Sequence, residues 1–296
     1  MKILALDTSG KQAGAAIMDK YITIGEILIN AQSGPKTWHH SEILMPGVER
    51  LFALSGMELS DMDYIAYTSG PGSFTGIRIG AATALGLARG INRPAVQVPT
   101  LDALAYNVLC IGEGGIVAPL LDARRGQVYG AVYLKEAAGG FLRLTDYFAA
   151  SIEEAMNIIM TAVGNRDVIT QAYSLDGACG IPGQARNDER PNGTPPSSVI
   201  PGLTRNPTSF AVCEGSVIFL GDGACANKPA IQALYPAAQF APINSNRQRP
   251  ASVALCAMHQ IKNNPKTGTQ PVDIIYIRDP QAVRNLKKEG CCACGG

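Results

Sequence analysis

The chain has 296 residues, enough for one large domain or for two lobes that each bury a core. Hydrophobic residues make up 46% of the chain and charged residues 17%, and no apolar run approaches the roughly 20 residues of a membrane-spanning helix, so we expect no membrane span. The 25 lysines and arginines are balanced by 24 aspartates and glutamates, whereas a protein that binds nucleic acid alone usually carries a basic excess.

The first half of the sequence predicts three strands followed by alternating helices and strands. It opens MKILALDTSG, an alternating apolar stretch that reaches Asp7 too soon for a signal peptide, so we expect a cytoplasmic protein. Apolar runs of strand period and of helix period then follow one another. The expected strands are Lys2–Thr8, Ala13–Met18, Tyr21–Asn30, Asp63–Thr68 and Ala95–Val98, and the expected helices are Ser41–Leu54, Phe74–Arg89 and Leu101–Leu109.

The second half repeats this order of elements. The expected strands are Gly115–Leu121, Gln127–Leu134, Leu142–Phe148, Val217–Gly221 and Gln239–Ile243, and the expected helices are Ile152–Val163, Ala226–Leu234 and Ala251–Ile261. Both halves therefore read β-β-β-α-β-α-β-α. When LALDTSGKQAGAAI is placed over PLLDARRGQVYGAV, Asp7 falls on Asp122, and each aspartate ends a first strand.

A duplicated unit of this kind is typical of the actin, hexokinase and Hsp70 (ASKHA) class of α/β proteins, in which two lobes face one another. We expect an N-terminal lobe over 1–105 and a C-terminal lobe over 106–296. Residues 174–208 are dense in Gly, Pro, Asn, Ser and Thr without periodicity, which predicts a surface insertion of undetermined role.

The run YTSGPGSFTGIRIG predicts a glycine-rich turn between a strand and a helix. Its spacing, G-x-G-x-x-x-G, is neither the dinucleotide fingerprint nor a P-loop. Ser73 is placed to cap the helix. Gly76, Gly80, Ala84 and Ala88 recur every four residues, and the cost of helical glycine indicates a close approach by the sheet, by a neighbouring helix or by another protein.

Six strings in this order carry a resemblance to a known family. They are DTS at Asp7–Ser9, HSEILMP at His40–Pro46, GPGSFTGIRIGAATALGLA at Gly70–Ala88, LLDARRGQVYGAVY at Leu120–Tyr133, LGDGA at Leu220–Ala224 and YIR at Tyr276–Arg278. Together they resemble the TsaB (YeaZ) family, the dimerisation subunits of the bacterial machinery that makes threonylcarbamoyladenosine (t6A) at position 37 of tRNA. The likeness runs from Met1 to about Gln281 apart from the insertion.

The resemblance implies a non-catalytic subunit that activates TsaD, the transferase of the same fold, for modification of N6 of adenosine 37 in tRNAs that read ANN codons. It implies TsaE as a further partner, contact with tRNA only through the complex, and a homodimer where TsaD is absent. It places the partner interface on the first-lobe helices, and the interface residues that it nominates are Ser41, Leu44, Met45, Val48, Gly76, Ile77, Gly80, Ala81 and Ala84.

The same fold class holds nucleotide at the ends of its first strands. The candidate nucleotide- or phosphate-binding residues are Asp7, Thr8, Ser9, Gly70, Gly72, Ser73, Arg78, Asp122, Arg124, Gly221, Asp222 and Gly223. The alternative for each is a structural role, and Arg124 with its neighbour could pair with the aspartates across an empty cleft. We expect no tightly bound cofactor, with ATP or ADP possible at the interface of the complex.

No catalytic or metal-binding residue is predicted. Thr100 and Leu104 stand where the resemblance to TsaD would require two metal-binding histidines, and no nucleophile has a base beside it, which disfavours a peptidase. Two alternatives remain: a stand-alone ATP-dependent enzyme of the same fold, such as a kinase or carbamoyltransferase, and a homodimeric binding module.

The eight cysteines do not form a disulfide pattern. Apolar neighbours predict buried thiols, and this set is Cys110, Cys179, Cys213, Cys225 and Cys256. Cys291, Cys292 and Cys294 crowd a glycine-rich tail that makes a poor zinc site, and its role stays open.

Overall fold

The computed structural model describes residues 1–31, 38–137, 139–165, 216–264, 267–268, 274–275 and 277. The predicted insertion at 174–208, the tail cysteines, and Tyr276 and Arg278 of the YIR string lie outside the described residues. Cys179 and Cys213 lie outside them as well.

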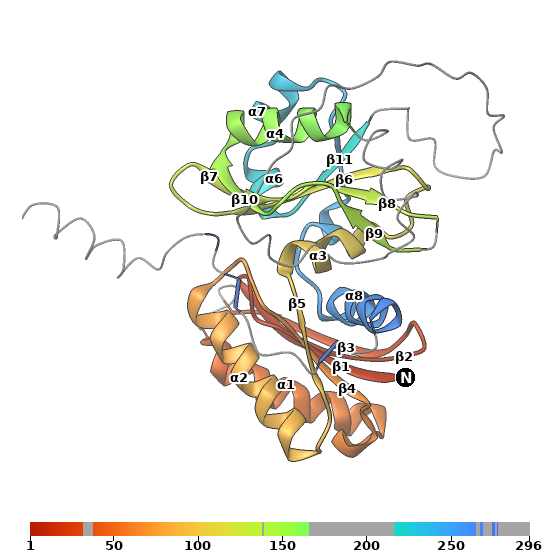
Figure 1. The fold of residues 1–296 in the computed structure, drawn as a ribbon. Helices are drawn as coiled ribbons and strands as arrows, with labels where there is room; N and C mark the ends of the chain where they lie inside the picture. Colours follow the sequence, from red (N-terminus) through yellow and green to blue (C-terminus); the bar gives the residue numbers. More distant parts are fainter. Residues whose placement is uncertain are drawn as a thin grey trace, which may run out of the picture.

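The first sheet has the strand order β3-β2-β1-β4-β5 (Figure 1). Its strands are β1 (Lys2–Asp7), β2 (Gln12–Asp19), β3 (Ile22–Asn30), β4 (Tyr64–Thr68) and β5 (Ala95–Val98). β2 and β3 run antiparallel to their neighbours, whereas β4 and β5 run parallel to β1. Helices cover both faces of this sheet, which explains why β1 and β2 are almost continuously apolar.

Helices α1 (His40–Ser55) and α2 (Phe74–Gly90) pack on one face of the first sheet. The 3-10 turn η1 (Leu59–Asp61) lies between them in the sequence. Helix α8 (Pro250–Asn263) packs on the other face, against β1 and β2 (Figure 1). α8 therefore follows the second sheet in sequence and covers the first sheet in space, so a division of the chain at 105/106 separates α8 from the sheet that it covers.

The second sheet repeats the first, with the path β10-β7-β6-β11-β12. Its strands are β6 (Ile116–Asp122), β7 (Gln127–Gly130), β8 (Tyr133–Lys135), β9 (Phe141–Arg143), β10 (Phe148–Ser151), β11 (Val217–Leu220) and β12 (Gln239–Phe240). Because the order of positions matches that of the first sheet, the predicted duplication and the ASKHA fold class are confirmed.

Two predicted strands of the second sheet are each interrupted. The predicted strand Gln127–Leu134 is divided into β7 and β8, and the register of β6 with both places Pro119 opposite the break. Proline has no amide hydrogen, so it cannot continue the ladder there. The predicted strand Leu142–Phe148 is wrong as a single strand, because β9 pairs with β8 while β10 pairs with β7. The β8–β9 end of this hairpin thus departs from the main path of the sheet.

Helix α3 (Thr100–Ala105), followed by the 3-10 turn η2 (Tyr106–Val108), lies between the two sheets and contacts both α8 and β6 (Figure 1). Helices α4 (Ile152–Gly164), α6 (Asp222–Ala226) and α7 (Lys228–Leu234) accompany the second sheet. The predicted single helix Ala226–Leu234 is therefore two short helices that begin earlier. The chain turns at Asn227, and Pro229 in the first turn of α7 starts the second helix.

The described cysteines divide between core and surface. Cys256 on α8 is buried, as predicted, whereas Cys110 and Cys225 are exposed. Cys110 lies in the turn after η2, and Cys225 lies on an outward side of the short helix α6. None of the helices in the described ranges combines the length and the apolar character that crossing a bilayer requires.

Candidate functional site: the turns at the ends of the first strands

The Asp-Thr-Ser turn at the end of β1 is held by hydrogen bonds within itself. Asp7 is 2% exposed, and its Oδ1 accepts the Ser9 amide at 2.8 Å, the Ser9 hydroxyl at 2.7 Å and the Thr68 hydroxyl at 3.2 Å. The Thr8 hydroxyl donates to the carbonyl of Gly76 at 2.7 Å. These donors are therefore committed to the packing of the turn.

The glycine-rich turn closes directly over the end of β1. The Ser73 amide donates to the carbonyl of Ser9 at 2.7 Å, and the Ser73 side chain accepts the Gly76 amide at 3.2 Å, which confirms the predicted helix cap. Gly70 has φ 107°, and a Cβ on Gly72 would collide with the Ser9 carbonyl. Both glycines thus serve the close approach of two backbone segments.

The small residues of α2 face the interior of the lobe. A Cβ on Gly76 would lie under 3.0 Å from the carbonyl oxygen of Thr8, and a Cβ on Gly80 would lie under 3.0 Å from the Thr8 hydroxyl. Of the three partners that the spacing left open, the one that approaches is the first sheet, through Thr8 in the turn that ends β1. This finding corrects the nomination of Gly76 and Gly80 as partner contacts.

Most of the other nominated interface residues are also buried. Five of them lie inside the first lobe, and these are Leu44, Val48, Ile77, Ala81 and Ala84. They pack in or beside the core between α1, α2 and the sheet, so the nomination is corrected for them too. Only Ser41 and Met45 of the nine are exposed. The helical period of α1 and α2 could be predicted from the sequence. The sequence did not indicate which face of each helix is exposed to solvent.

The outward face of α2 carries a second row at the same four-residue spacing: Phe74, Arg78, Ala82 and Gly86 are all exposed. Phe74 is 39% exposed, and the Arg78 guanidinium lies 3.9 Å from the centre of its ring. A Cβ on Gly86 would meet nothing within 4 Å. Unlike Gly76 and Gly80, Gly86 has no neighbour inside the lobe that requires a glycine.

Asp7 offers little to a metal-bound nucleotide of the kind that the fold class implies. Burial raises the pKa of Asp7, and hydrogen bonds from Ser9 and Thr68 act in the opposite direction. Its Oδ2 is buried and has no hydrogen-bond partner among the described residues. A phosphate or metal would need exposed donors and carboxylate oxygens, and this buried turn fits neither group.

In the equivalent turn of the second lobe, Asp122 is exposed, whereas Gly221 and Gly223 pack against backbone. Asp122 is exposed, its Oδ1 accepts the Arg124 amide at 2.7 Å, and its own amide donates to Asp222 Oδ1 at 3.0 Å. Gly221 and Gly223 pack against the backbone of Leu120–Asp122, so a side chain at either position would collide. These glycines place α6 on β6.

The pairing of arginines with the aspartates, which the sequence left open as an alternative, is not seen among the described residues. Arg124 and Arg125 are exposed and have φ of 60° and 59°, in the left-handed region. Within the described ranges, no ion pair joins either arginine to Asp7 or Asp122.

Within the described ranges, His, Cys, Asp and Glu side chains nowhere gather in groups of three. His40 lies half-buried beside the glycine-rich turn, where burial lowers its pKa and the Gly10 carbonyl raises it. The ring of His259 on α8 lies tilted beside that of Tyr106, with the ring centres 6.2 Å apart.

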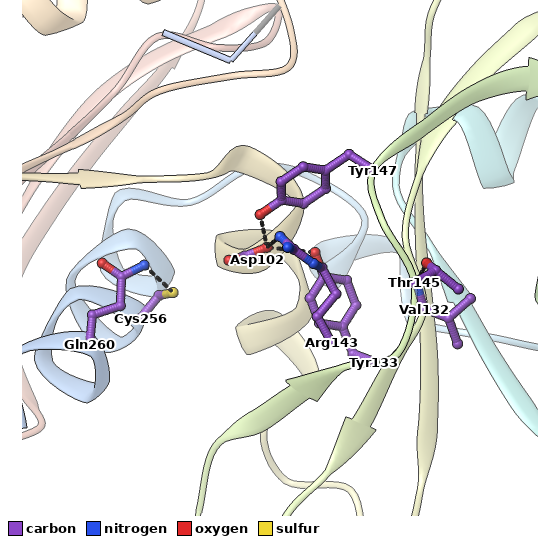
Figure 2. Close-up of polar contacts among 8 residues, drawn as sticks. All are labelled: Asp102, Val132, Tyr133, Arg143, Thr145, Tyr147, Cys256 and Gln260. Carbon is purple, nitrogen blue, oxygen red and sulfur yellow. Dashed lines mark hydrogen bonds and ion pairs between the residues drawn. The ribbon is translucent and has the colours of Figure 1, made fainter. Parts of the chain in front are cut away.

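One polar cluster was missed by the sequence analysis. Asp102, in the first turn of α3, accepts hydrogen bonds from Tyr133 and Tyr147, with Arg143 beside it (Figure 2). These residues come from four places in the sequence, and no motif connects them. Only the bend of the second-lobe hairpin brings them together.

The fold defines an ASKHA-type protein in which the first-strand turn of the first lobe is buried and that of the second lobe is exposed at Asp122. The family model of TsaD, described as tRNA N6-adenosine threonylcarbamoyltransferase, matches residues 36–161. The tRNA threonylcarbamoyladenosine biosynthesis protein TsaB of Escherichia coli K12 is 34% identical over 139 residues, which cover 47% of this chain and 58% of that protein. TsaB of Bacillus subtilis 168 is 37% identical over 133 residues, covering 45% of this chain and 55% of that protein.

These alignments confirm the resemblance to the TsaB (YeaZ) family, and the chain spans less than two thirds of the length of these two relatives. Among solved structures, YeaZ from Pseudomonas aeruginosa superposes with a TM-score of 0.59 at 20% identity, over 93% of this chain and 99% of that one. A second structure, described as similar to peptidase YeaZ from Pseudomonas aeruginosa, has the same TM-score of 0.59 at 19% identity, over 94% of this chain and 99% of that one. This likeness supports the fold.

Proposed function

We propose that the chain is a non-catalytic subunit that binds and activates a TsaD-type threonylcarbamoyltransferase, in the modification of N6 of adenosine 37 in tRNAs that read ANN codons. The names of the relatives support a role in t6A synthesis. The buried Asp7–Ser9 turn supports the absence of chemistry at the end of β1, since its donors are already used. In this proposal the chain is cytoplasmic, TsaE is a further partner, and tRNA is reached through the complex.

The observation that carries the proposal is the outward face of α1 and α2. Met45 is 36% exposed and Phe74 39% exposed, on two helices that contact each other. Ala82 and Gly86 are exposed small residues of α2 in the same row as Phe74. We name Met45, Phe74, Ala82 and Gly86 the outer α1–α2 face. It offers apolar side chains beside small residues that let another helix approach closely.

A partner with the same fold would present a comparable pair of helices, so the two first lobes could pack helix against helix. Large contiguous apolar patches mark protein contacts in many soluble proteins. Any ATP or ADP would then be held at the interface of the complex and not by the turns of this chain alone.

The experiment is reconstitution with the cognate TsaD, TsaE and TsaC, together with tRNA, ATP, threonine and bicarbonate. Modified adenosine should form only when this chain is present. Ala82→Arg should abolish TsaD binding because it crowds the outer α1–α2 face, whereas Ala233→Arg, at an exposed alanine of α7, should leave binding intact. Equal yields with and without the chain would refute the activating role.

Two further outcomes identify the alternatives. Threonylcarbamoyl transfer or ATP turnover by the purified chain alone would indicate an enzyme. A homodimer that Ala82→Arg dissociates, and that added TsaD leaves unchanged, would indicate a homodimeric binding module. A Gly80→Arg variant would not serve here, because the new side chain would point at Thr8 inside the lobe.

A further inference from the structure

Helix α3 is the direct connection between the two sheets. It follows β5 of the first sheet, precedes β6 of the second sheet, and packs against both α8 and β6. The orientation of one lobe relative to the other therefore depends on how firmly α3 is held at each side.

The first turn of α3 is bonded to both lobes. The Thr100 amide donates to the carbonyl of Gly70, in the glycine-rich turn of the first lobe, at 2.7 Å. Two residues later, Asp102 Oδ1 accepts the hydroxyl of Tyr133 at 2.6 Å and that of Tyr147 at 2.7 Å, both from the second lobe (Figure 2). A single helical turn thus joins the turn that starts α2 to the hairpin of the second sheet.

Arg143 completes the second-lobe side of this contact. Its Nη1 lies 4.0 Å from Asp102 Oδ1, and its guanidinium lies 4.0 Å from the centre of the Tyr147 ring. The side chains of Asp102 and Arg143 are 21% and 15% exposed, so water has little access to replace these partners. A carboxylate that left this site would lose two charge-assisted hydrogen bonds and a nearby cation.

The bend of the hairpin is what makes the cluster possible. Tyr133 lies on β8 and Arg143 on β9, and Tyr147 directly precedes β10. In the first lobe the corresponding strands β2 and β3 continue past a single register shift at Ile17/Met18 and are not split. The second lobe departs from its own repeat at the place where it meets α3.

We infer that Asp102 and its three second-lobe partners, Tyr133, Arg143 and Tyr147, form a latch that fixes α3 to the second sheet, so that the two lobes keep one relative orientation. Beyond the latch, Asp102 acts electrostatically on Tyr106 of η2 and on Cys256 of α8. Burial raises the pKa of both, so neither adds a competing charge at neutral pH. On the first-lobe side, Asn107 on η2 holds the segment that leads into α8, since its amide donates to the carbonyls of Ser245 and Arg247 and its Oδ1 accepts the Ser252 hydroxyl of α8.

The latch is tested on the chain alone, so the result does not depend on the proposed function. Ketone-bearing amino acids at positions 49 and 153, on exposed faces of α1 and α4, accept nitroxide labels while the native cysteines stay in place. Pulsed electron paramagnetic resonance then reports the distance between the lobes. We expect one narrow distance in the unsubstituted background.

The double variant Tyr133→Phe with Tyr147→Phe removes both hydroxyls with little change in volume, and we expect loss of the single narrow distance. Asp102→Ala should have the same effect, whereas Asp102→Asn keeps an acceptor oxygen and should retain the narrow distance. Tyr64→Phe, on β4 of the first sheet, is the matched control and should change nothing.

Amide hydrogen exchange gives a second measurement on the same proteins. The latch predicts faster exchange at Ala103–Ala105 in the double variant, with cooperative unfolding preserved. A broad distance in the unsubstituted background, or an unchanged narrow distance in the folded double variant, would overturn the inference. The double variant decides the question if Asp102→Ala does not fold.

Discussion

Two groups of Thr8 lie against glycines of α2: the hydroxyl lies against Gly80 and the carbonyl against Gly76. Because the groups differ, substitutions at the two glycines should respond differently to a change at Thr8. Gly80→Ala places a methyl group against the Thr8 hydroxyl, and Gly76→Ala places one against the Thr8 carbonyl. Each substitution should lower the free energy of unfolding by about 1–3 kcal/mol through overpacking. Thr8→Ala should rescue Gly80→Ala, because it removes the colliding hydroxyl, but not Gly76→Ala, because the carbonyl remains. Urea unfolding of the single and double variants measures both couplings. Equal rescue of the two would contradict the geometry.

Asp7 gives a second prediction at this scale, on the pH dependence of stability. Burial raises its pKa above 3.8, so the native state binds more protons than the unfolded state in the window from 3.8 up to the raised value. Stability due to Asp7 therefore falls as the pH rises through that window. Asp7→Asn keeps an oxygen for the Ser9 and Thr68 donors and removes the buried charge. At pH 7 we expect the free energy of unfolding of the variant to be up to about 1 kcal/mol higher than that of the parent protein. This difference should disappear in acid, where Asp7 of the parent protein is protonated and uncharged.

The difference between the two unfolding curves, measured from pH 3 to pH 8, isolates Asp7 from the other carboxylates. The same variant also tests the structural role of the turn. If Asp7 instead held a metal-bound nucleotide, Asp7→Asn would abolish t6A formation in the reconstituted system while leaving the fold unchanged. Retained activity is the expected outcome.

On the scale of the element, a substitution at Gly86 of α2 should change the stability of the chain and its binding to a partner in opposite directions. Glycine inside a helix costs about 1 kcal/mol relative to alanine, and nothing within the lobe requires it at this position. Gly86→Ala should therefore stabilise the isolated chain by about 0.5–1 kcal/mol and weaken binding to TsaD. Thermal unfolding and calorimetric titration measure the two effects. Gly90→Ala, which also meets open space at the end of the same helix, should leave binding unchanged. Unaltered binding by Gly86→Ala would remove Gly86 from the proposed interface.

The elements also show which features the sequence could predict. The strands and first two helices of the first lobe, the Ser73 cap and the duplicated order all follow from local patterns, and the structure confirms them. The predicted helix Leu101–Leu109 is wrong in its second half, because α3 ends at Ala105 and the 3-10 turn η2 follows. Which side of α2 faces inward did not follow, because small residues recur at four-residue spacing on both sides, as the pair Gly76 and Gly80 and as the pair Ala82 and Gly86. The neighbour that decides between them, Thr8, is far away in sequence. The break opposite Pro119 and the Asp102 cluster were missed for the same reason, since they depend on strand register and on contacts between lobes.

The path of the chain through the whole molecule makes the first lobe dependent on α8. The core between the first sheet and α8 contains Val253, Met258 and Ile261, and Glu26 of β3 accepts the Ala251 amide at 3.0 Å and pairs with Arg249. Burial of three such side chains contributes about 5–9 kcal/mol, which is comparable to the roughly 5–15 kcal/mol stability of a whole domain. The lobe should therefore not fold from its contiguous sequence alone.

We expect a fragment of residues 1–109 to lack cooperative unfolding by circular dichroism and to show little amide protection. Joining residues 248–264 to that fragment through a flexible linker should restore a cooperative transition, because it returns both the apolar face of α8 and the partner of Glu26. The same fusion with Val253→Asp and Met258→Asp is the matched control and should stay unfolded. Cooperative folding of residues 1–109 without α8 would show instead that the first lobe is an autonomous domain, and that α8 only joins the two lobes.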